Sequence, residues 1–265
     1  MLTYVYYYIE SLNEAANKNN IEVVYFLLHK KEKIANNYFR YDNKMKMLAI
    51  PPSVISVEDY AFNQCSSLME VSVPPSLISI GKYAFSECNK LISINIPSSL
   101  TSIGDHCFFL CSRLKHVNFE FPSSLISIED YSFGNCENLY EITIPLSVTK
   151  IGICAFIGCS NMKQISIPSS VKSIGKSAFE CCSSLTQISI PFSVTSIEDS
   201  SFCKCISLKQ ILIPSSVKSI GKNAFQSCSS LIQISFHTHS NLETIGIESF
   251  KECSRLKQIT IPSSV

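Results

Sequence analysis

Thiols are abundant among the side chains of this sequence that could do chemistry, since it contains 13 cysteines. Nine of them recur at one place in successive stretches of about 23 residues: Cys65, Cys88, Cys111, Cys136, Cys159, Cys182, Cys205, Cys228 and Cys253. Disulfides or a metal site are conceivable, but zinc requires clustered ligands such as a C-x2-C pair with a matching partner pair. A row with one thiol per repeat gives each sulfur only two neighbours. We therefore expect free cysteines that pack as small apolar side chains in a reducing compartment.

The best candidate set of metal ligands is Cys107 and Cys111 together with His106 and His116. Thiolate and imidazole are the ligands that zinc prefers, but these four residues lack the spacing of a known zinc motif. Packing in the core is the simpler interpretation of the two cysteines.

A cysteine nucleophile is the second chemical possibility. Cys181 and Cys203 stand outside the regular row, and we expect them to lie nearer the surface. A nucleophilic thiol needs an activating histidine, and the candidates His237 and His239 fall in a different repeat. The sequence therefore gives no strong reason to predict catalysis.

Three repeats contain two adjacent carboxylates at one position, namely Glu58-Asp59, Glu129-Asp130 and Glu198-Asp199. Neighbouring residues on one turn usually face solvent, so these pairs resemble general acid–base pairs in composition only. Acidic residues are favourable at the start of a helix, where several other repeats have Gly-Lys. The sequence also has only eight glycines and no glycine-rich phosphate loop. We predict no catalytic residue, no cofactor and no metal.

The composition excludes several kinds of partner. The net charge is +1 and only 16% of residues are charged, which disfavours nucleic acid. No apolar run reaches the roughly 18 residues of a membrane helix. The N-terminus has Glu10 early and no basic region or cleavage site, and no asparagine lies in an Asn-x-Ser/Thr acceptor. These features favour the cytoplasm.

The thiols are positioned by a repeat of 23 residues, with two units of 25. Its template is I-P-x-S-V-x-x-I-G-x-x-A-F-x-x-C-x-x-L-x-x-I-x. Units begin at Ile50, Val73, Ile96, Phe121, Ile144, Ile167, Ile190, Ile213 and Phe236, and a partial unit begins at Ile261. A period of 20–29 residues with fixed apolar positions predicts a solenoid, because one unit cannot bury its own apolar face.

Each unit predicts two local structures. Leu185, Ile188 and Ile190 alternate with polar residues, which indicates a short parallel strand with one buried face. Ala178 and Phe179 precede Cys182 by four and three residues, which favours a short helix or 3₁₀ turn. An unbroken phenylalanine column should fill the core: Phe62, Phe85, Phe108, Phe133, Phe156, Phe179, Phe202, Phe225 and Phe250.

The repeated stretch "IPSSVKSIGKSAFECCSSL" and its relatives resemble the leucine-rich repeats of the BspA-like, Treponema-type family. The resemblance covers residues 50–265, as nine full units and one partial unit. It implies a curved solenoid without enzymatic activity, with roles in adhesion or protein binding. It also makes placement on the cell surface possible.

The segment "LNEAANKNNIEVVYFLL", residues 12–28, is similar to the two helices of an ankyrin repeat. A single such unit cannot form an array, and its apolar face must cover something. We expect residues 1–49 to form a small helical cap on the first rung.

The polar face of the predicted strands is the expected docking surface, because solenoids bind partners on their extended strand side. Its C-terminal half is uniform Gln and Ser, whose side chains could bond to one another. Its middle is varied, and Tyr and charged residues supply strong contacts. We expect a protein partner at Lys115, His116, Asn118, Tyr140, Glu141 and Lys163. The alternative is a structural element that self-associates end to end.

Overall fold

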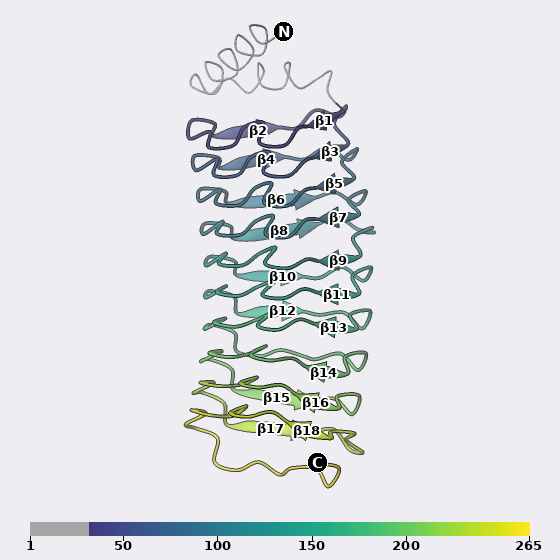
Figure 1. Cartoon of the computed structure of the whole chain (residues 1–265), viewed down its shortest axis with the longest axis vertical. Coiled ribbons are helices and arrows are strands. Elements are labelled where there is room, and N and C mark those ends of the chain that lie inside the picture. The colour runs from purple at the N-terminus through teal and green to yellow at the C-terminus, as the bar shows by residue number, and fades with distance from the viewer. Residues whose placement is uncertain (1–31) are drawn as a thin grey trace, which may run out of the picture.

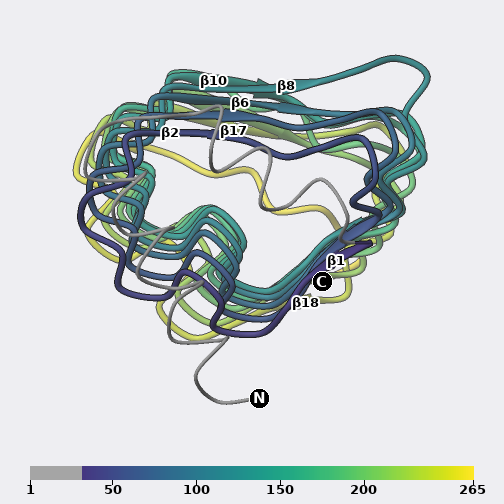
Figure 2. The same ribbon diagram turned by 90° about the horizontal axis from the view of Figure 1, so that it is seen from above.

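Each coil of the chain contributes short strands in which buried and exposed residues alternate. The computed structural model describes residues 32–265, and these residues form a parallel β-solenoid (Figure 1). In Figure 2 the coils superpose as a closed outline, with strands along two of its sides and turns along the third.

The first side, which we call the strand face, contains the longer strands. They are β2 (Met47–Ala49), β4 (Glu70–Ser72), β6 (Ser93–Ile96), β8 (His116–Phe119), β10 (Glu141–Thr143), β12 (Gln164–Ser166), β15 (Gln210–Ile213) and β17 (Gln233–Phe236). The strands pair in parallel and in register, so that Ile142 of β10 lies beside Ile165 of β12. In-register pairing continues one buried column across successive coils.

The second face contains strands of two residues. They are β1 (Lys33–Ile34), β3 (Ser56–Val57), β5 (Ser79–Ile80), β7 (Ser102–Ile103), β9 (Ser127–Ile128), β11 (Lys150–Ile151), β13 (Ser173–Ile174), β14 (Ser196–Ile197), β16 (Ser219–Ile220) and β18 (Thr244–Ile245). The second residue of each strand from β1 to β16 is buried, while Ile245 of β18 is partly buried. The second face therefore contributes one continuous column of buried Ile and Val side chains to the core.

The third side, which we call the turn face, contains the Ala-Phe-Cys segment of each repeat. The expectation of a short helix or 3₁₀ turn there is wrong, because the described residues contain no helix. Each coil has two residues four apart with positive φ, for example Tyr60 (58°) and Gln64 (61°). A helix needs consecutive residues in the right-handed region, so a left-handed residue ends each turn. Alternate amides instead donate to the next coil, as Phe62 N–H does to Ala84 O at 2.8 Å.

A continuous aromatic stack fills the core, as predicted. Ring centroids of successive phenylalanines lie 5.1 Å apart for Phe62 and Phe85 and 5.6 Å apart for Phe156 and Phe179, with the rings nearly parallel. The stack continues to Phe250. Each coil therefore buries its ring between the rings of its two neighbours.

The expected helical cap of residues 1–49 can be compared with the structure only in part. The ankyrin-like stretch at residues 12–28 lies outside the described residues. Residues 32–49 form strands instead of helices, since β1 pairs with β3 and β2 pairs with β4. Phe39 also stacks on Phe62 at 5.1 Å. This segment lacks the Ile-Pro motif, so an alignment on that motif missed its place in the stack.

Candidate binding surface on the strand face

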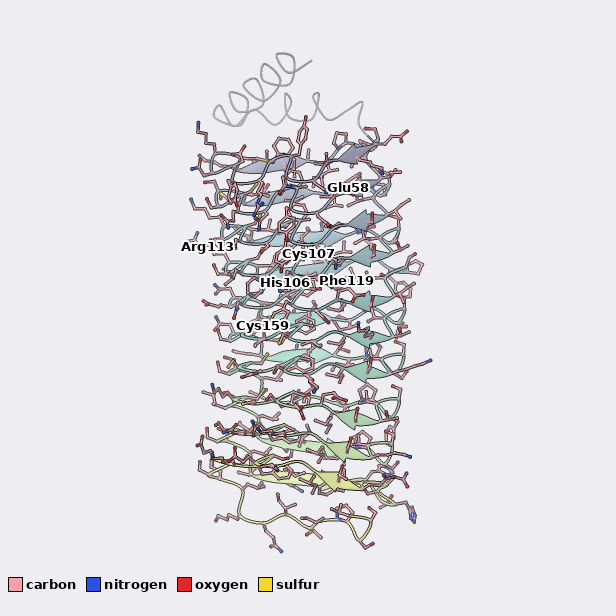
Figure 3. All side chains as sticks on the ribbon, viewed as in Figure 1. Glu58, His106, Cys107, Arg113, Phe119 and Cys159 are labelled. Atoms are coloured by element: carbon pink, nitrogen blue, oxygen red, sulfur yellow. The ribbon has the colours of Figure 1, made fainter. Side chains whose placement is uncertain are left out.

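The row of nine cysteines is buried in the core, and all of these thiols are free. Each S–H also donates to the carbonyl of the phenylalanine in the preceding coil; Cys159 Sγ, for example, lies 3.2 Å from Phe133 O. Burial raises the pKa of Cys111 to about 12. The Cys111 thiol is therefore a protonated packing group at neutral pH. Figure 3 marks another member of the row, Cys159, within the stack.

The candidate metal ligands around Cys107 do not converge. Cys107 and Cys111 are fully buried, whereas His116 is exposed in β8 on the strand face. His106 is stacked between Tyr83 and Tyr131, with ring centroids 4.4 and 4.5 Å apart. Within residues 32–265 no group of three or more His, Cys, Asp or Glu side chains could hold a metal ion.

The candidate nucleophiles are also poorly suited to attack. Cys181 is half-buried, but Cys203 is only 5% exposed, contrary to the expectation that it lies nearer the surface. Burial, followed by the nearby Glu180, raises the pKa of Cys203 to about 11. His237 packs edge-on against Phe192 at 5.1 Å.

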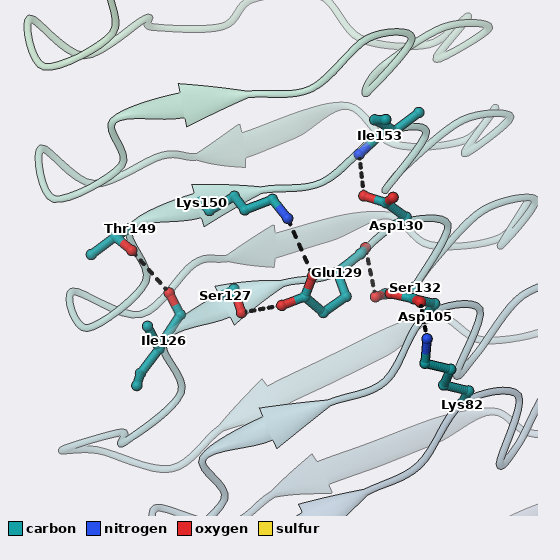
Figure 4. Close-up of polar contacts among 10 residues, drawn as sticks. All are labelled: Lys82, Asp105, Ile126, Ser127, Glu129, Asp130, Ser132, Thr149, Lys150 and Ile153. Carbon is teal, nitrogen blue, oxygen red and sulfur yellow. Dashed lines mark hydrogen bonds and ion pairs between the residues drawn. The ribbon is translucent and has the colours of Figure 1, made fainter. Parts of the chain in front are cut away.

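The paired carboxylates stabilise the coil stack. The Glu129 carboxylate accepts a hydrogen bond from the Ser127 hydroxyl and forms an ion pair with Lys150, whose Nζ lies 3.4 Å from Glu129 Oε2 (Figure 4). Asp130 accepts the backbone N–H of Ile153 in the next coil at 2.7 Å. The expected helix start is absent, because Asp130 bridges two coils through this bond.

The structure brings the six predicted docking residues together on β8, β10 and β12 and the residues that precede them. All six are exposed. His116 and Glu141 are register partners, and Glu141 is paired in turn with Gln164, whose Nε2 donates to it at 2.9 Å. The Lys163 ammonium lies 5.1 Å from the centroid of the Tyr140 ring.

Two hollows lie along the strand face. The smaller, about 360 Å³, is lined by His116, Asn118 and Glu141, with Phe119 and Phe121 beside them. Phe121 is 82% exposed and gives this hollow an apolar edge. Half of the six-residue patch therefore lines one depression.

The larger groove, about 820 Å³, lies over the uniform C-terminal half, which the sequence analysis did not single out. It is lined by Gln164, Gln187, Gln210 and Gln233 and by the exposed Leu212. The expected bonding among these polar side chains is sparse: Gln233 donates to Ser235 at 3.0 Å. Gln187 and Gln210 make no side-chain hydrogen bond within the described part of the chain. Their free amides leave the groove open to a ligand.

The comparisons with solved structures identify leucine-rich repeat proteins. One from Bacteroides ovatus is 26% identical and has a TM-score of 0.64, over 87% of this chain and 70% of that one. One from T. pallidum is 26% identical and has a TM-score of 0.52, over 76% and 78%. A leucine rich cell surface protein from Faecalibacterium prausnitzii is 26% identical and has a TM-score of 0.43, over 85% and 82%.

No curated protein matches the chain. No helix in residues 32–265 is long and apolar enough to span a membrane. The family model of the BspA type leucine-rich repeat region matches residues 32–163, 117–232 and 149–265. These matches begin at the first described coil, which supports the place of β1 and β2 in the solenoid. The chain belongs to the BspA type leucine-rich repeat family.

Proposed function

We propose that the chain is a non-catalytic scaffold that docks a protein partner on its strand face, at the patch formed by Lys115, His116, Asn118, Tyr140, Glu141 and Lys163. The observation that carries this proposal is the gathering of six exposed, varied side chains on three successive coils beside a hollow. Leucine-rich repeat arrays commonly use this extended surface for binding.

The chemistry of the patch suits a protein. Tyr140 offers an amphipathic ring, and the ammonium of Lys163 lies over that ring in a cation–π contact. Tyrosine is one of the residue types that are enriched at interface hot spots. Glu141 lines both hollows, so a partner segment that leaves the patch along the solenoid axis enters the glutamine-lined groove.

The test is affinity capture from the native cell with the tagged chain and with the double variant Tyr140→Ala, Glu141→Lys. Loss of a hot-spot ring together with a charge reversal should weaken the captured complex by about tenfold or more. The matched control is Ile78→Ala, Glu243→Lys, which truncates one exposed apolar side chain and makes the same charge change away from the strand face.

The proposal requires a partner that binds the wild type and the control equally well and binds the double variant weakly. Equal binding to all three chains would place the interface elsewhere. Light scattering on the same samples distinguishes the self-association hypothesis, since growth of the scattering mass with concentration would support it. The cytoplasmic location stays a prediction.

A further inference from the structure

In every coil from β3 onwards, one position is occupied only by Glu or Gly, and the two recur with a period of three coils. This position directly follows the second-face strand. In order along the chain it holds Glu58, Gly81, Gly104, Glu129, Gly152, Gly175, Glu198, Gly221 and Gly246. The order Glu-Gly-Gly is repeated three times.

The glycines allow a close approach between coils. A Cβ added to Gly175 would lie 2.6 Å from the carbonyl carbon of Gly152, and a Cβ added to Gly152 would lie 2.7 Å from that of Glu129. Separations this short are not tolerated, so only glycine fits at this spacing. Each of the six glycines donates its N–H to the coil before it; the bond from Gly175 to Ile151 O, for example, is 2.9 Å long.

The backbone hydrogen bond to the preceding coil is lost where a coil with Glu at this position comes directly after a coil with Gly. Within the described residues, the amides of Glu129 and Glu198 have no hydrogen-bond acceptor, and neither do those of Ile126 and Thr195 in the same coils. The corresponding amides of the glycine coils are bonded, as Lys218 N–H is to Thr195 O at 2.8 Å. The second face accordingly divides into β1-β3-β5-β7, β9-β11-β13 and β14-β16-β18.

The first glutamate shows that Glu alone does not break the ladder. The preceding coil has Ala35 at this position, and the Glu58 N–H donates to Ile34 O in that coil at 2.9 Å. The two interruptions therefore coincide with the steps from Gly104 to Glu129 and from Gly175 to Glu198. We call them the first seam and the second seam.

The strand face is weakened at the same coils. At the first seam, β8 and β10 are joined by the single register pair His116 and Glu141. At the second seam, residues 187–190 form no strand, so the strand face has no arrow between β12 and β15 in Figure 1. The turn face stays bonded there, since Ser177 N–H donates to Asp199 O at 2.9 Å.

We propose that the Glu-Gly-Gly order divides the solenoid into a first block of four coils and two blocks of three coils, and that the second seam is a hinge about the turn face. Missing ladders on two sides and an intact ladder on the third allow the strand face and the second face to open together. Backbone amides without acceptors exchange through small local openings, whereas bonded amides in the array must wait for larger ones. This inference does not depend on the proposed binding function.

The test is residue-resolved hydrogen exchange of the whole chain. The amides of Ile126, Glu129, Thr195 and Glu198 should exchange about tenfold or more faster than those of the matching positions Thr149, Gly152, Lys218 and Gly221. Equal rates at the two sets of positions would contradict the existence of seams.

The variant Glu198→Gly tests the cause, because removal of the Cβ permits the close approach that the glycine coils have. We expect exchange at residues 195 and 198 to slow by about tenfold. Glu58→Gly is the matched control, since its coil is already bonded, and exchange at residues 55 and 58 should not slow. Unchanged or faster exchange at residue 198 in Glu198→Gly would overturn the role of Glu.

The reverse variant Gly175→Ala should create a new interruption. Its Cβ would clash with the backbone of Gly152, so the amide of residue 175 should exchange about tenfold faster while the chain stays folded. Exchange as slow as in the wild type would show that the glycines are not needed for the ladder, and would contradict the proposal.

Discussion

At the scale of single residues, the thiol row performs two tasks that the sequence shows only in part. The spacing predicted free, buried cysteines, and the structure confirms both features. The hydrogen bond to the preceding phenylalanine carbonyl, 3.2 Å long for Cys182 and Phe156, could not be predicted from the sequence. Its partner is 26 residues away and depends on the path of the turn face. A thiol fits the column because it is small, apolar and still a weak donor.

The buried thiols predict loss of stability in alkali. The pKa of Cys111 is raised from 9.0 to about 12 by burial, so its contribution is complete below pH 9 and disappears as the pH rises towards 12. In that window the unfolded chain releases a proton that the folded chain keeps, and the free energy of unfolding falls by up to about 1.4 kcal/mol per pH unit for each such thiol.

Urea unfolding at several pH values above 9 measures this slope. The variant Cys111→Ala should show a shallower decline than the wild type, because one coupled proton is removed. An identical slope in the two proteins would assign the pH dependence to other groups.

At the scale of the elements, the turn face marks the limit of what the pattern predicts. Strand positions follow from the two-residue alternation in most coils, and β4, β8 and β15 lie where it places them. The strand predicted at residues 185–190 is absent, although Leu185, Ile188 and Ile190 are buried as the alternation requires. The conformation of the turn face cannot be predicted from the sequence, because its left-handed positions hold residues as different as Tyr60, Leu110 and Lys204. Glycine is the usual signal for positive φ, and here only Gly158 supplies it. Without that signal, the spacing of Ala, Phe and Cys suggested a helix.

The left-handed positions predict an unusual effect of glycine. Lys204 is exposed with φ of 59°, so Lys204→Gly removes backbone strain and should stabilise the chain by about 0.5–1 kcal/mol. Lys209 is exposed without a positive φ, and Lys209→Gly should destabilise by about 0.5–1 kcal/mol. Urea midpoints distinguish the two variants, and a loss of stability in both would contradict the strain.

At the scale of the whole molecule, each coil contacts only its neighbours, as the nearest-neighbour arrangement of a solenoid requires. The stack of coils and its aromatic core were predictable, since every unit repeats the same apolar columns. The position of the larger groove was not, because the uniform Gln and Ser columns carry no variation to mark it. That Gln187 and Gln210 line this groove is visible only in the folded structure.

The nearest-neighbour arrangement predicts that position along the stack sets the cost of a core mutation. Phe156 is fully buried between Phe133 and Phe179, and Phe156→Ala should cost about 3–5 kcal/mol. Phe250 is partly buried and stacks on Phe225 alone among the described residues, so Phe250→Ala should cost roughly half as much.

The exposed Phe121 provides the control, since Phe121→Ala should change the free energy of unfolding by less than about 0.5 kcal/mol. Denaturant unfolding measures all three variants. Equal costs at Phe156 and Phe250 would indicate a core that behaves as one unit instead of a series of coils.

The regular thiol row also allows partial unfolding to be measured by chemical labelling of the natural cysteines. Because each unit from Cys65 to Cys253 hides one such sulfur, an alkylating reagent adds one mass increment for a unit that has come apart, or two where Cys107, Cys154, Cys181 or Cys203 belongs to the same unit. Intact-mass spectra taken during unfolding would then consist of discrete steps. Their distribution would report whether units separate singly, in threes or all at once, without any engineered label.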